Sequence, residues 1–353
     1  MNGNKKTDIR SLSRLEIDNF FSTIDEKSFR AKQVFEWLWK KGCHSFEEMS
    51  NLPQSLRNQL SEVFSFDVIR EAGQQKSSDG TLKIGFNLHD GAMIEGVLIP
   101  AEERTTACIS TQAGCALGCT FCATATLGFS RNLTVPEIFD QVWLLNEASH
   151  KQHGIPLSNI VLMGMGEPLF NYPNVSRAIE LITGEEGLGI SPQRITLSTV
   201  GVPKVIRQLA DDKFKPHLAV SLHAATDIKR NRIIPFNQRY PISELTESLI
   251  YYHEKTGKRF TIEYLLLKDF NDTLADARSL AELCKNFPVK VNLIEFNPVQ
   301  GIRFQRSDMR HMKEFRDFLE SKNMVVNIRQ SRGKDIDAAC GQLAAKNAGN
   351  EKK

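Results

Sequence analysis

The sequence contains no apolar run long enough to span a membrane, and its first residues, MNGNKKTDIR, contain no apolar segment of the kind that directs secretion. We therefore expect a cytosolic protein without a membrane partner, and in the cytosol stable disulfides are rare. The chain also has no internal repeat and no low-complexity tract. With 353 residues, of which 41% are hydrophobic and 25% charged, it is long enough for one large domain with an accessory module.

The chain also has little excess charge, since its formal net charge is +3 and its isoelectric point is near 8.4. That balance permits nucleic-acid binding but does not indicate it. Two local clusters of basic residues are more suggestive. They contain Lys229, Arg230, Arg232 and Arg239 in one stretch, and Arg303, Arg306, Arg310 and Lys313 in another. Each cluster is either a solvated basic surface or a candidate contact for a nucleic acid.

Helix patterns dominate from residue 11 to about residue 66. In FRAKQVFEWLWKKG the apolar residues Val34, Phe35, Leu38 and Trp39 fall on one face, and Gly42 ends the pattern. The later segment TLKIGFNLHDGAMIEGVLIP predicts two strands joined at Asp90-Gly91, because Asp-Gly is typical of a tight hairpin turn.

From residue 105 onward, strand patterns alternate with amphipathic helix patterns. The six predicted strands are Thr106–Ser110, Asn159–Met163, Arg194–Thr199, His217–Leu222, Phe260–Leu267 and Val289–Phe296. Repeated β-α units favour a parallel sheet in an α/β fold, either an open doubly wound sheet or a partial barrel. We expect a helical accessory domain at 1–66, a β-hairpin connection at 67–104, the α/β domain at 105–330, and a C-terminal loop and tail at 331–353.

Seven cysteines in a cytosolic chain indicate metal ligation or thiol chemistry for some of them. Cys115, Cys119 and Cys122 follow a C-x₃-C-x₂-C spacing directly after the first strand of the β-α series, with no obvious fourth cysteine nearby. Three thiolates on a [4Fe–4S] cluster would leave one iron open for a small molecule. The spacing also leaves open a zinc site completed by a histidine.

Polar residues and glycines follow the ends of the other strands. Gly164, Gly166 and Glu167 follow the second strand, while Ser198, Ser221, His223 and Asn297 end or follow later ones. Each residue alone is more typical of a structural role. Together they lie at the same end of successive parallel strands, which is where a binding site on this architecture forms.

Four motifs resemble those of the radical S-adenosylmethionine (SAM) enzymes that methylate adenosine in RNA. They are CALGCTFC, GMGEP, the SLH strand end and the C-terminal DIDAACGQL. The resemblance covers nearly the whole chain. GEPL and RIIPFNQRYP are more similar to the branch that methylates adenine C2 in tRNA and at the peptidyl-transferase centre of 23S rRNA than to its C8-methylating, antibiotic-resistance relative. This implies a partial (β/α)6 radical-SAM barrel with an N-terminal helical accessory domain and a β-hairpin connection.

By this resemblance, Cys115, Cys119 and Cys122 bind a [4Fe–4S] cluster whose open iron takes the amino and carboxylate groups of SAM. The residues that match the family's SAM contacts are Gly166, Glu167, Ser198, Ser221, Leu222, His223 and Asn297. The partners implied are 23S rRNA and tRNA as substrates, and an electron donor such as flavodoxin or ferredoxin.

Adenine C2 is an electron-poor carbon without a lone pair, so a carbon radical can add to it where a simple displacement on SAM has no reason to work. The resemblance implies that Cys340 takes a methyl group from a first SAM and that a radical from a second SAM removes a hydrogen atom from that group. The resulting methylene radical attacks C2. Glu95 then removes the C2 proton, and Cys108 attacks the Cys340 sulfur, which forms a transient disulfide and frees the product.

Without the resemblance, these three residues have plainer interpretations. Cys108 and Cys340 would each be small buried hydrophobic residues, and Glu95 would be an exposed strand acid. Glu95 is nevertheless the only charged residue in GAMIEGVLIP, which indicates a partly desolvated carboxylate. Two alternatives to the adenine-C2 enzyme remain open from the sequence, namely a C8 methyltransferase and a zinc-stabilised RNA-binding module without catalysis.

Overall fold

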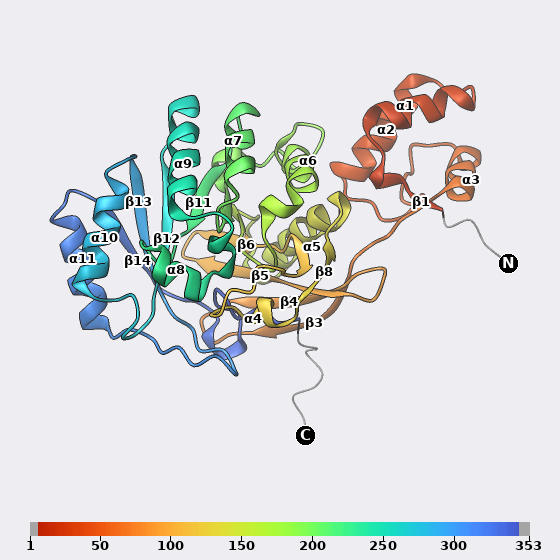
Figure 1. Cartoon of the computed structure of the whole chain (residues 1–353). Helices are drawn as coiled ribbons and strands as arrows, with labels where there is room; N and C mark the ends of the chain where they lie inside the picture. Colours follow the sequence, from red (N-terminus) through yellow and green to blue (C-terminus); the bar gives the residue numbers. More distant parts are fainter. Residues whose placement is uncertain (1–5, 346–353) are drawn as a thin grey trace.

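The computed structural model describes residues 6–345, and its centre is a ten-stranded sheet. The parallel part of the sheet contains, in spatial order, β14 (Val325–Arg329), β13 (Val289–Glu295), β12 (Phe260–Leu266), β11 (His217–Ser221), β10 (Ile195–Thr199), β9 (Asn159–Leu162) and β6 (Arg104–Cys108) (Figure 1). Three antiparallel strands continue the sheet beyond β6, namely β5 (Met93–Ala101), β4 (Leu82–Asn87) and β3 (Arg70–Lys76).

The order of the strands decides between the two expected α/β architectures. Each parallel strand pairs with the next one along the chain, from β6 through β9 to β14. A doubly wound sheet reverses its winding at a switch point, whereas a barrel winds in one direction. Because this sheet never reverses and ends at the separate edges β14 and β3, it is a partial barrel.

All six predicted strands and the predicted hairpin are present. The hairpin turn lies at Asp90-Gly91, where the Gly91 N–H donates to the Leu88 carbonyl and the Leu88 N–H donates to the Ala92 carbonyl. The sequence patterns missed β3 and β14. Both are edge strands with mostly exposed or half-buried residues, so they lack the apolar pattern that marks a core strand.

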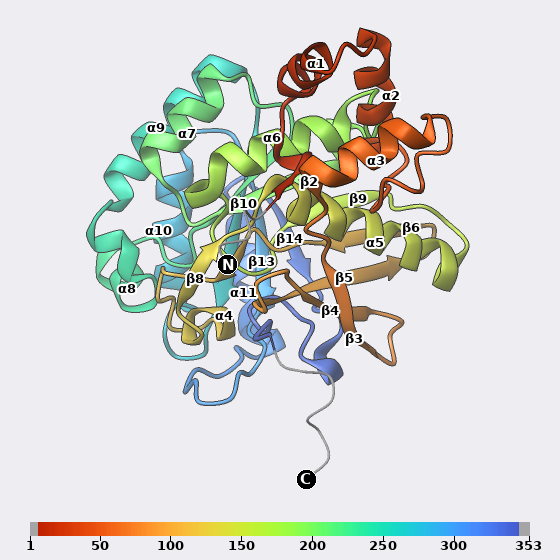
Figure 2. The same cartoon turned by 90° about the vertical axis from the view of Figure 1, so that its right-hand side faces the viewer.

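Long helices follow the parallel strands, and Figure 2 shows α6, α7 and α9 lying outside them. The helices after the cysteine triplet are α4 (Ala123–Thr126), α5 (Val135–His153), α6 (Tyr172–Thr183), α7 (Pro203–Asp211), α8 (Asp227–Ile233), α9 (Ile242–Thr256), α10 (Leu274–Cys284) and α11 (Met309–Glu320). The expected capping box opens α5 at Thr134 and Glu137, and Gly257 ends α9 in a left-handed conformation. Within the described residues, no helix is both long enough and apolar enough to cross a membrane.

The N-terminal part is helical, as the patterns predicted. It contains β1 (Thr7–Asp8), the 3-10 turn Ile9–Ser11, α1 (Arg14–Thr23), α2 (Ser28–Trp39), α3 (Gln54–Val63) and β2 (Phe64–Ser65), which pairs with β1. Figure 1 shows these helices at the end of the molecule opposite α10 and α11.

A ring contact and a buried ion pair are among the contacts that dock the N-terminal part on α5. The Trp39 indole meets the Phe139 ring edge to face, with 4.9 Å between their centroids. The Arg10 guanidinium donates two hydrogen bonds to the Asp140 carboxylate, at 2.7 and 2.8 Å, and both side chains are almost fully buried. Because the pair is bidentate, it fixes the orientation of this part on the barrel as well as its position.

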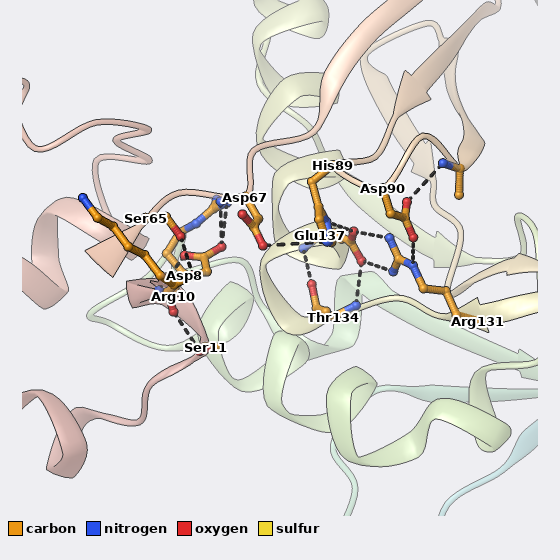
Figure 3. Close-up of polar contacts among 12 residues, drawn as sticks. Asp8, Arg10, Ser11, Ser65, Asp67, His89, Asp90, Arg131, Thr134 and Glu137 are labelled. Carbon is orange, nitrogen blue, oxygen red and sulfur yellow. Dashed lines mark hydrogen bonds and ion pairs between the residues drawn. The ribbon is translucent and has the colours of Figure 1, made fainter. Parts of the chain in front are cut away.

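A chain of polar contacts extends from this junction to the hairpin (Figure 3). His89 in the hairpin turn lies 3.8 Å from the Asp67 carboxylate and 3.5 Å from the Glu137 carboxylate. Glu137 accepts two hydrogen bonds from Arg131, which also donates to Asp90. The hairpin turn, the start of α5 and the segment that leaves the N-terminal part are therefore joined by one network.

The buried pair between Arg10 and Asp140 gives the first prediction. The Asp140→Asn substitution removes the bidentate carboxylate from a buried guanidinium and leaves it only the 3.4 Å contact with Asp8, so the cost approaches that of a broken buried pair, about 3–5 kcal/mol. We expect a lower temperature of unfolding and faster proteolysis between residues 66 and 70. Arg177→Gln is the control, because the Arg177–Glu180 pair is exposed and exposed pairs contribute about 1 kcal/mol or less. Equal stability of Asp140→Asn and the unsubstituted protein would contradict this account of docking.

Candidate active site

A cavity of about 310 Å³ opens at the carboxyl ends of the parallel strands. Residues from β6, β9, β10, β11, β12 and β14 line it, together with the cysteine loop and residues 338–343 of the C-terminal segment. Its size suits a small organic ligand, and such ligands bind at this end of the strands in barrel-type folds.

The cysteine triplet lies in a tight loop on the wall of this cavity. Cys115 follows the strand β7 (Gln112–Gly114), which pairs with β8 (Phe129–Asn132), and Cys122 caps the start of α4. At Gly114 the backbone has a φ of +75°, and a Cβ atom there would lie 1.9 Å from the Gly128 carbonyl oxygen. Only glycine fits this position, which is why the loop can bring Cys115 onto the wall next to Cys119.

The three thiols fit a multi-iron ligand set. Burial raises the pKa of Cys115 to about 11. Burial, and next the proximity of Cys122 and Cys115, raise the pKa of Cys119 well above its usual value. A positive charge bound beside Cys115 and Cys119 would oppose this rise in pKa. Within residues 6–345, no group of three or more His, Cys, Asp or Glu side chains is gathered closely enough to hold one metal ion directly.

The glycine-rich turn after β9 lines the same cavity as the triplet. A Cβ atom on Gly164 would lie 2.6 Å from the Ile109 carbonyl oxygen, so this turn packs directly on the strand that leads to the cysteines. Glu167 is buried on the wall, and its carboxylate accepts hydrogen bonds from the N–H groups of Leu169 and Val200 at 3.0 and 2.9 Å. Burial raises the pKa of this carboxyl. The carboxylate therefore holds two neighbouring loops together as well as facing the cavity.

The strand ends supply a second group of polar atoms. The hydroxyls of Ser198 and Ser221 lie 3.3 Å apart on the wall. His223 has a φ of +57°, and its Nδ1 accepts a hydrogen bond from the Leu265 N–H. Burial lowers the pKa of His223 to about 3, so the ring is neutral at physiological pH and its Nε2 carries the proton. This arrangement offers two hydroxyls and a ring N–H to a polar ligand.

Cys108 and Cys340 line the same cavity as the triplet, although more than 200 residues of chain separate them. Cys108 ends β6, and burial raises the pKa of its thiol to about 12. The Cys340 side chain is exposed to the cavity yet enclosed by protein, and this burial also raises the pKa of its thiol. All seven cysteines, every one of them within the described residues, are free.

The C-terminal segment closes over the cysteine loop through backbone contacts. The Ala123 N–H donates to the Gly341 carbonyl at 2.8 Å, and the Thr124 hydroxyl donates to the Leu343 carbonyl at 2.7 Å. The Asn297 amide lies 3.4 Å from the Cys340 carbonyl. These contacts place Cys340 beside the triplet.

Three of the residues singled out from the sequence do not line the cavity. Glu95 is buried in β5, and its carboxylate accepts hydrogen bonds from the N–H groups of Ala344 and Ala345. Leu222 is buried in the core. Asn297 lies behind the wall, where its Oδ1 is buried without a hydrogen-bond partner among the described residues.

The structure places Arg230, which the sequence assigned to a basic surface cluster, in the interior. Arg230 is almost completely buried, and its guanidinium donates to the carbonyls of Leu222 and Val200 and to the Asn237 side chain. It therefore holds loops together and cannot contact a nucleic acid. Its place in a run with Lys229 and Arg232 could not reveal this, because burial depends on the tertiary packing of the loops.

The structure adds two charged residues that the sequence patterns did not indicate. Glu263 in β12 and Arg329 at the end of β14 both line the cavity, with 3.5 Å between the Glu263 carboxylate and the Arg329 guanidinium. Glu263 had a visible signal, since it is the one charge in the apolar strand FTIEYLL. Arg329 had none, because its strand was itself not predicted.

Comparisons with known proteins agree with this geometry. The model of the ribosomal RNA large subunit methyltransferase N-terminal domain matches residues 7–66, and that of the radical SAM superfamily matches residues 109–281. The radical SAM match implies a [4Fe–4S] cluster and SAM, in place of the zinc ion that the cysteine spacing alone left open.

Whole-chain relatives extend the likeness. The chain is 51% identical to the "Probable dual-specificity RNA methyltransferase RlmN" of Cytophaga hutchinsonii, over 97% of this chain and 94% of that protein. It is 42% identical to the "Dual-specificity RNA methyltransferase RlmN" of Anaeromyxobacter dehalogenans, over 96% and 92% of the two chains. The crystal structure of a radical SAM methyltransferase from Sphaerobacter thermophilus superposes with a TM-score of 0.91 at 38% identity, covering 96% of this chain and 100% of that one. The chain therefore belongs to the dual-specificity RNA methyltransferases RlmN, within the radical SAM superfamily.

Proposed function

We propose that this protein methylates C2 of adenosine in 23S rRNA and in tRNAs, with Cys340 as the carrier of the methyl group. The observation that supports this most directly is that two further free thiols, Cys108 and Cys340, share one cavity with the cysteine triplet. A direct transfer from SAM to RNA has no need of these thiols. A carrier that must be loaded and then released needs both.

Cys115, Cys119 and Cys122 would hold the cluster. Gly166, the hydroxyls of Ser198 and Ser221, and the neutral ring of His223 would orient SAM. The unpartnered Oδ1 of Asn297 is a further acceptor near Cys340. When bound, the cluster and SAM supply a methyl cation equivalent and a radical that removes a hydrogen atom. We propose that two SAM molecules are used per turnover and that flavodoxin or ferredoxin delivers the electron.

Cys340 would act first as a nucleophile toward the methyl group. Burial raises its pKa, and the nearby Arg329 guanidinium opposes that rise, which favours the thiolate needed for attack. After the carbon–carbon bond to C2 has formed, Cys340 is tethered to the RNA, and the adduct radical would give back the one electron that was spent on cleaving SAM. Once the C2 proton has been removed, Cys108 as thiolate would attack the Cys340 sulfur, so that a disulfide replaces the carbon–sulfur bond. The electron pair of that bond would pass to the departing carbon, which takes up a proton and becomes the methyl group of the released base.

Glu95 would remove the C2 proton before that release. Val97 pairs with Cys108 across β5 and β6, so their side chains lie on one face of the sheet, and Glu95 shares that face because it lies two residues from Val97. Ile99, further along the same face, lines the cavity. The carboxylate also lies 3.6 Å from the Lys83 ammonium group, and release by Ala344 and Ala345 would free the oxygen that those N–H groups occupy. The segment that carries Cys340 therefore also controls the base.

The ligand assignment predicts the effect of removing one cysteine of the triplet. The Cys119→Ala variant should lose most of its iron and its ability to cleave SAM, because the cluster loses one of its three thiolates. Iron content and the visible absorption spectrum after anaerobic purification measure the first effect, and release of 5′-deoxyadenosine measures the second. Cys284→Ala is the control, since Cys284 is buried in α10 away from the cavity. An iron-replete and active Cys119→Ala variant would falsify the assignment.

The carrier role predicts a covalent mark on the protein. Peptide mass spectrometry of the protein from cells should find a methyl group on Cys340, and the mark should be absent when Cys115 is replaced by Ala. Cys43 is the internal control, because it lies in the N-terminal part and burial raises its pKa to about 12. Methylation of Cys43 or Cys284 in place of Cys340 would reject the carrier.

The release step predicts a trapped intermediate. In Cys108→Ala the earlier steps remain possible, but the thiol that breaks the tether is absent. We expect a protein–RNA adduct through Cys340 that appears as a shifted band on a denaturing gel and survives thiol reductant. Glu95→Gln should trap the same adduct one step earlier, with the C2 proton retained, which a C2-deuterated adenosine reports. Normal turnover by Cys108→Ala without a shifted band would exclude the two-cysteine mechanism.

A further inference from the structure

A small hydrophobic cluster beside the cavity carries a set of aromatic rings on its outer side. Its buried core includes Cys115, Cys119 and Phe296, and it is separate from the main core of the barrel. The partly buried aromatic residues that pack against it are Phe121, Phe236, Phe270 and Phe304. The proposed mechanism uses none of these rings, although they surround the loop at which it takes place.

The first group of rings forms a continuous row. Phe170, which is 36% exposed, meets Phe236 edge to face with 5.3 Å between ring centroids. Phe236 is in turn 5.3 Å from Tyr240. The exposed Arg239 guanidinium lies over the Tyr240 ring at 5.4 Å. We call these four residues the first row.

The second group combines two rings with two cations. Phe270 and Phe304 lie 5.7 Å apart. Arg232 lies 5.0 Å and Lys229 lies 5.9 Å from the centre of the Phe270 ring. Lys229 is also paired with Asp276, whereas no carboxylate among residues 6–345 pairs with Arg232 or with Arg239. We call these four residues the second row.

Direct contacts join the second row to the cysteine loop, and Phe236 of the first row packs against the cluster that contains Cys115 and Cys119. The Thr120 N–H donates to the Ile233 carbonyl at 3.0 Å, and the Thr120 hydroxyl lies 3.3 Å from the Arg232 carbonyl. In both Figures 1 and 2, α8, which carries Arg232, lies on the same side of the molecule as α4. The two rows therefore lie near the cysteine loop, which lines the same cavity as Cys340.

We propose that the first and second rows bind the single-stranded RNA on either side of the target adenosine, with neighbouring bases stacked on the rings and phosphates held by Arg232 and Arg239. This inference rests on the proposed function and adds to it the surface that holds the substrate. Bases that are splayed out of a helix stack on aromatic side chains and on guanidinium planes, and every base has a face that can do so. The exposed Phe170 ring and the partly buried rings around it, beside two guanidinium groups that no described carboxylate pairs with, have that composition.

The alternative partner for a basic surface is an acidic electron-transfer protein. Charge alone would suit either partner, since both are negative. The aromatic rings favour RNA, because a base can stack on a ring beside a cation and an acidic side chain cannot. The RNA assignment also explains why these rings lie at the loops around the entrance and not within the core.

The test measures binding of a fluorescently labelled single-stranded oligoribonucleotide, containing one adenosine within its target sequence, to the anaerobically prepared holoenzyme. Tyr240→Ala should weaken binding about 10-fold, because one base can no longer stack. Arg239→Gln and Arg232→Gln should weaken binding too, and each should lower the slope of log Kd against log salt concentration by about 0.7 for each phosphate that is no longer neutralised.

Matched controls come from a similar pair elsewhere on the surface. The Arg207 guanidinium lies over the Tyr251 ring at 5.3 Å, on α7 and α9. Tyr251→Ala and Arg207→Gln therefore remove the same chemical groups at a site away from the cavity, and they should leave RNA affinity unchanged. A circular dichroism melt of each variant confirms that the fold is retained.

Two outcomes overturn the inference. One is unchanged RNA affinity in both Tyr240→Ala and Arg239→Gln. The other is unchanged RNA affinity together with turnover that fails with flavodoxin but recovers with dithionite, which would assign the surface to the electron donor. Methylation of Cys340, measured on the same preparations, needs no RNA. Absence of the Cys340 methyl group from the unsubstituted protein would reject the proposed function. If that methyl group is present and the variants bind RNA as well as the unsubstituted protein, only this inference is rejected.

Discussion

Three thiols share one wall of a cavity, and the burial of Cys115 and Cys119 opposes their ionisation. The position of the thiols depends on a tight glycine turn at Gly114 and on the contact between the cysteine loop and α8. A group that brings positive charge would relieve this opposition. The remaining features of the site are arranged around that wall: strand-end hydroxyls, a neutral histidine and two further thiols.

The C-terminal segment contains Cys340 and also contacts Glu95, two residues to which the proposed function gives a role. It brings Cys340 into the cavity through bonds to Ala123 and Thr124, and it covers the Glu95 carboxylate through the N–H groups of Ala344 and Ala345. If Cys340 and Glu95 have the proposed roles, the base could act only when this segment moves. In that case one segment would control both residues, and no separate regulatory domain would be needed.

The N-terminal part and the aromatic rows lie on different parts of the barrel. The first is held by the Arg10–Asp140 pair and by the network around Glu137, and this fixes its orientation relative to the hairpin that carries Glu95. The aromatic rows are built on segments that follow the strand ends. Substrate RNA that contacts both would be placed over the entrance to the cavity by two surfaces that are rigidly connected through the sheet.

Much of this protein follows from its sequence by itself. The capping box at Thr134, the helix ends at glycines and the Asp-Gly turn are local, so they act on the chain before any distant contact forms. The alternation of strand and helix patterns indicates a parallel sheet, and the cysteine spacing indicates the metal-binding loop. The placement of polar residues after successive strands indicates where the cavity lies, because parallel strands end at one edge of the sheet.

Other features were decided only by the tertiary structure. The edge strands β3 and β14 gain their conformation by pairing with a neighbour, so their own residues show no core pattern. Arg230 is buried because three loops close around it, and Glu95 is covered because a segment some 250 residues away along the chain folds over it. Burial and pairing depend on residues that are distant in sequence, and a local pattern contains no information about them.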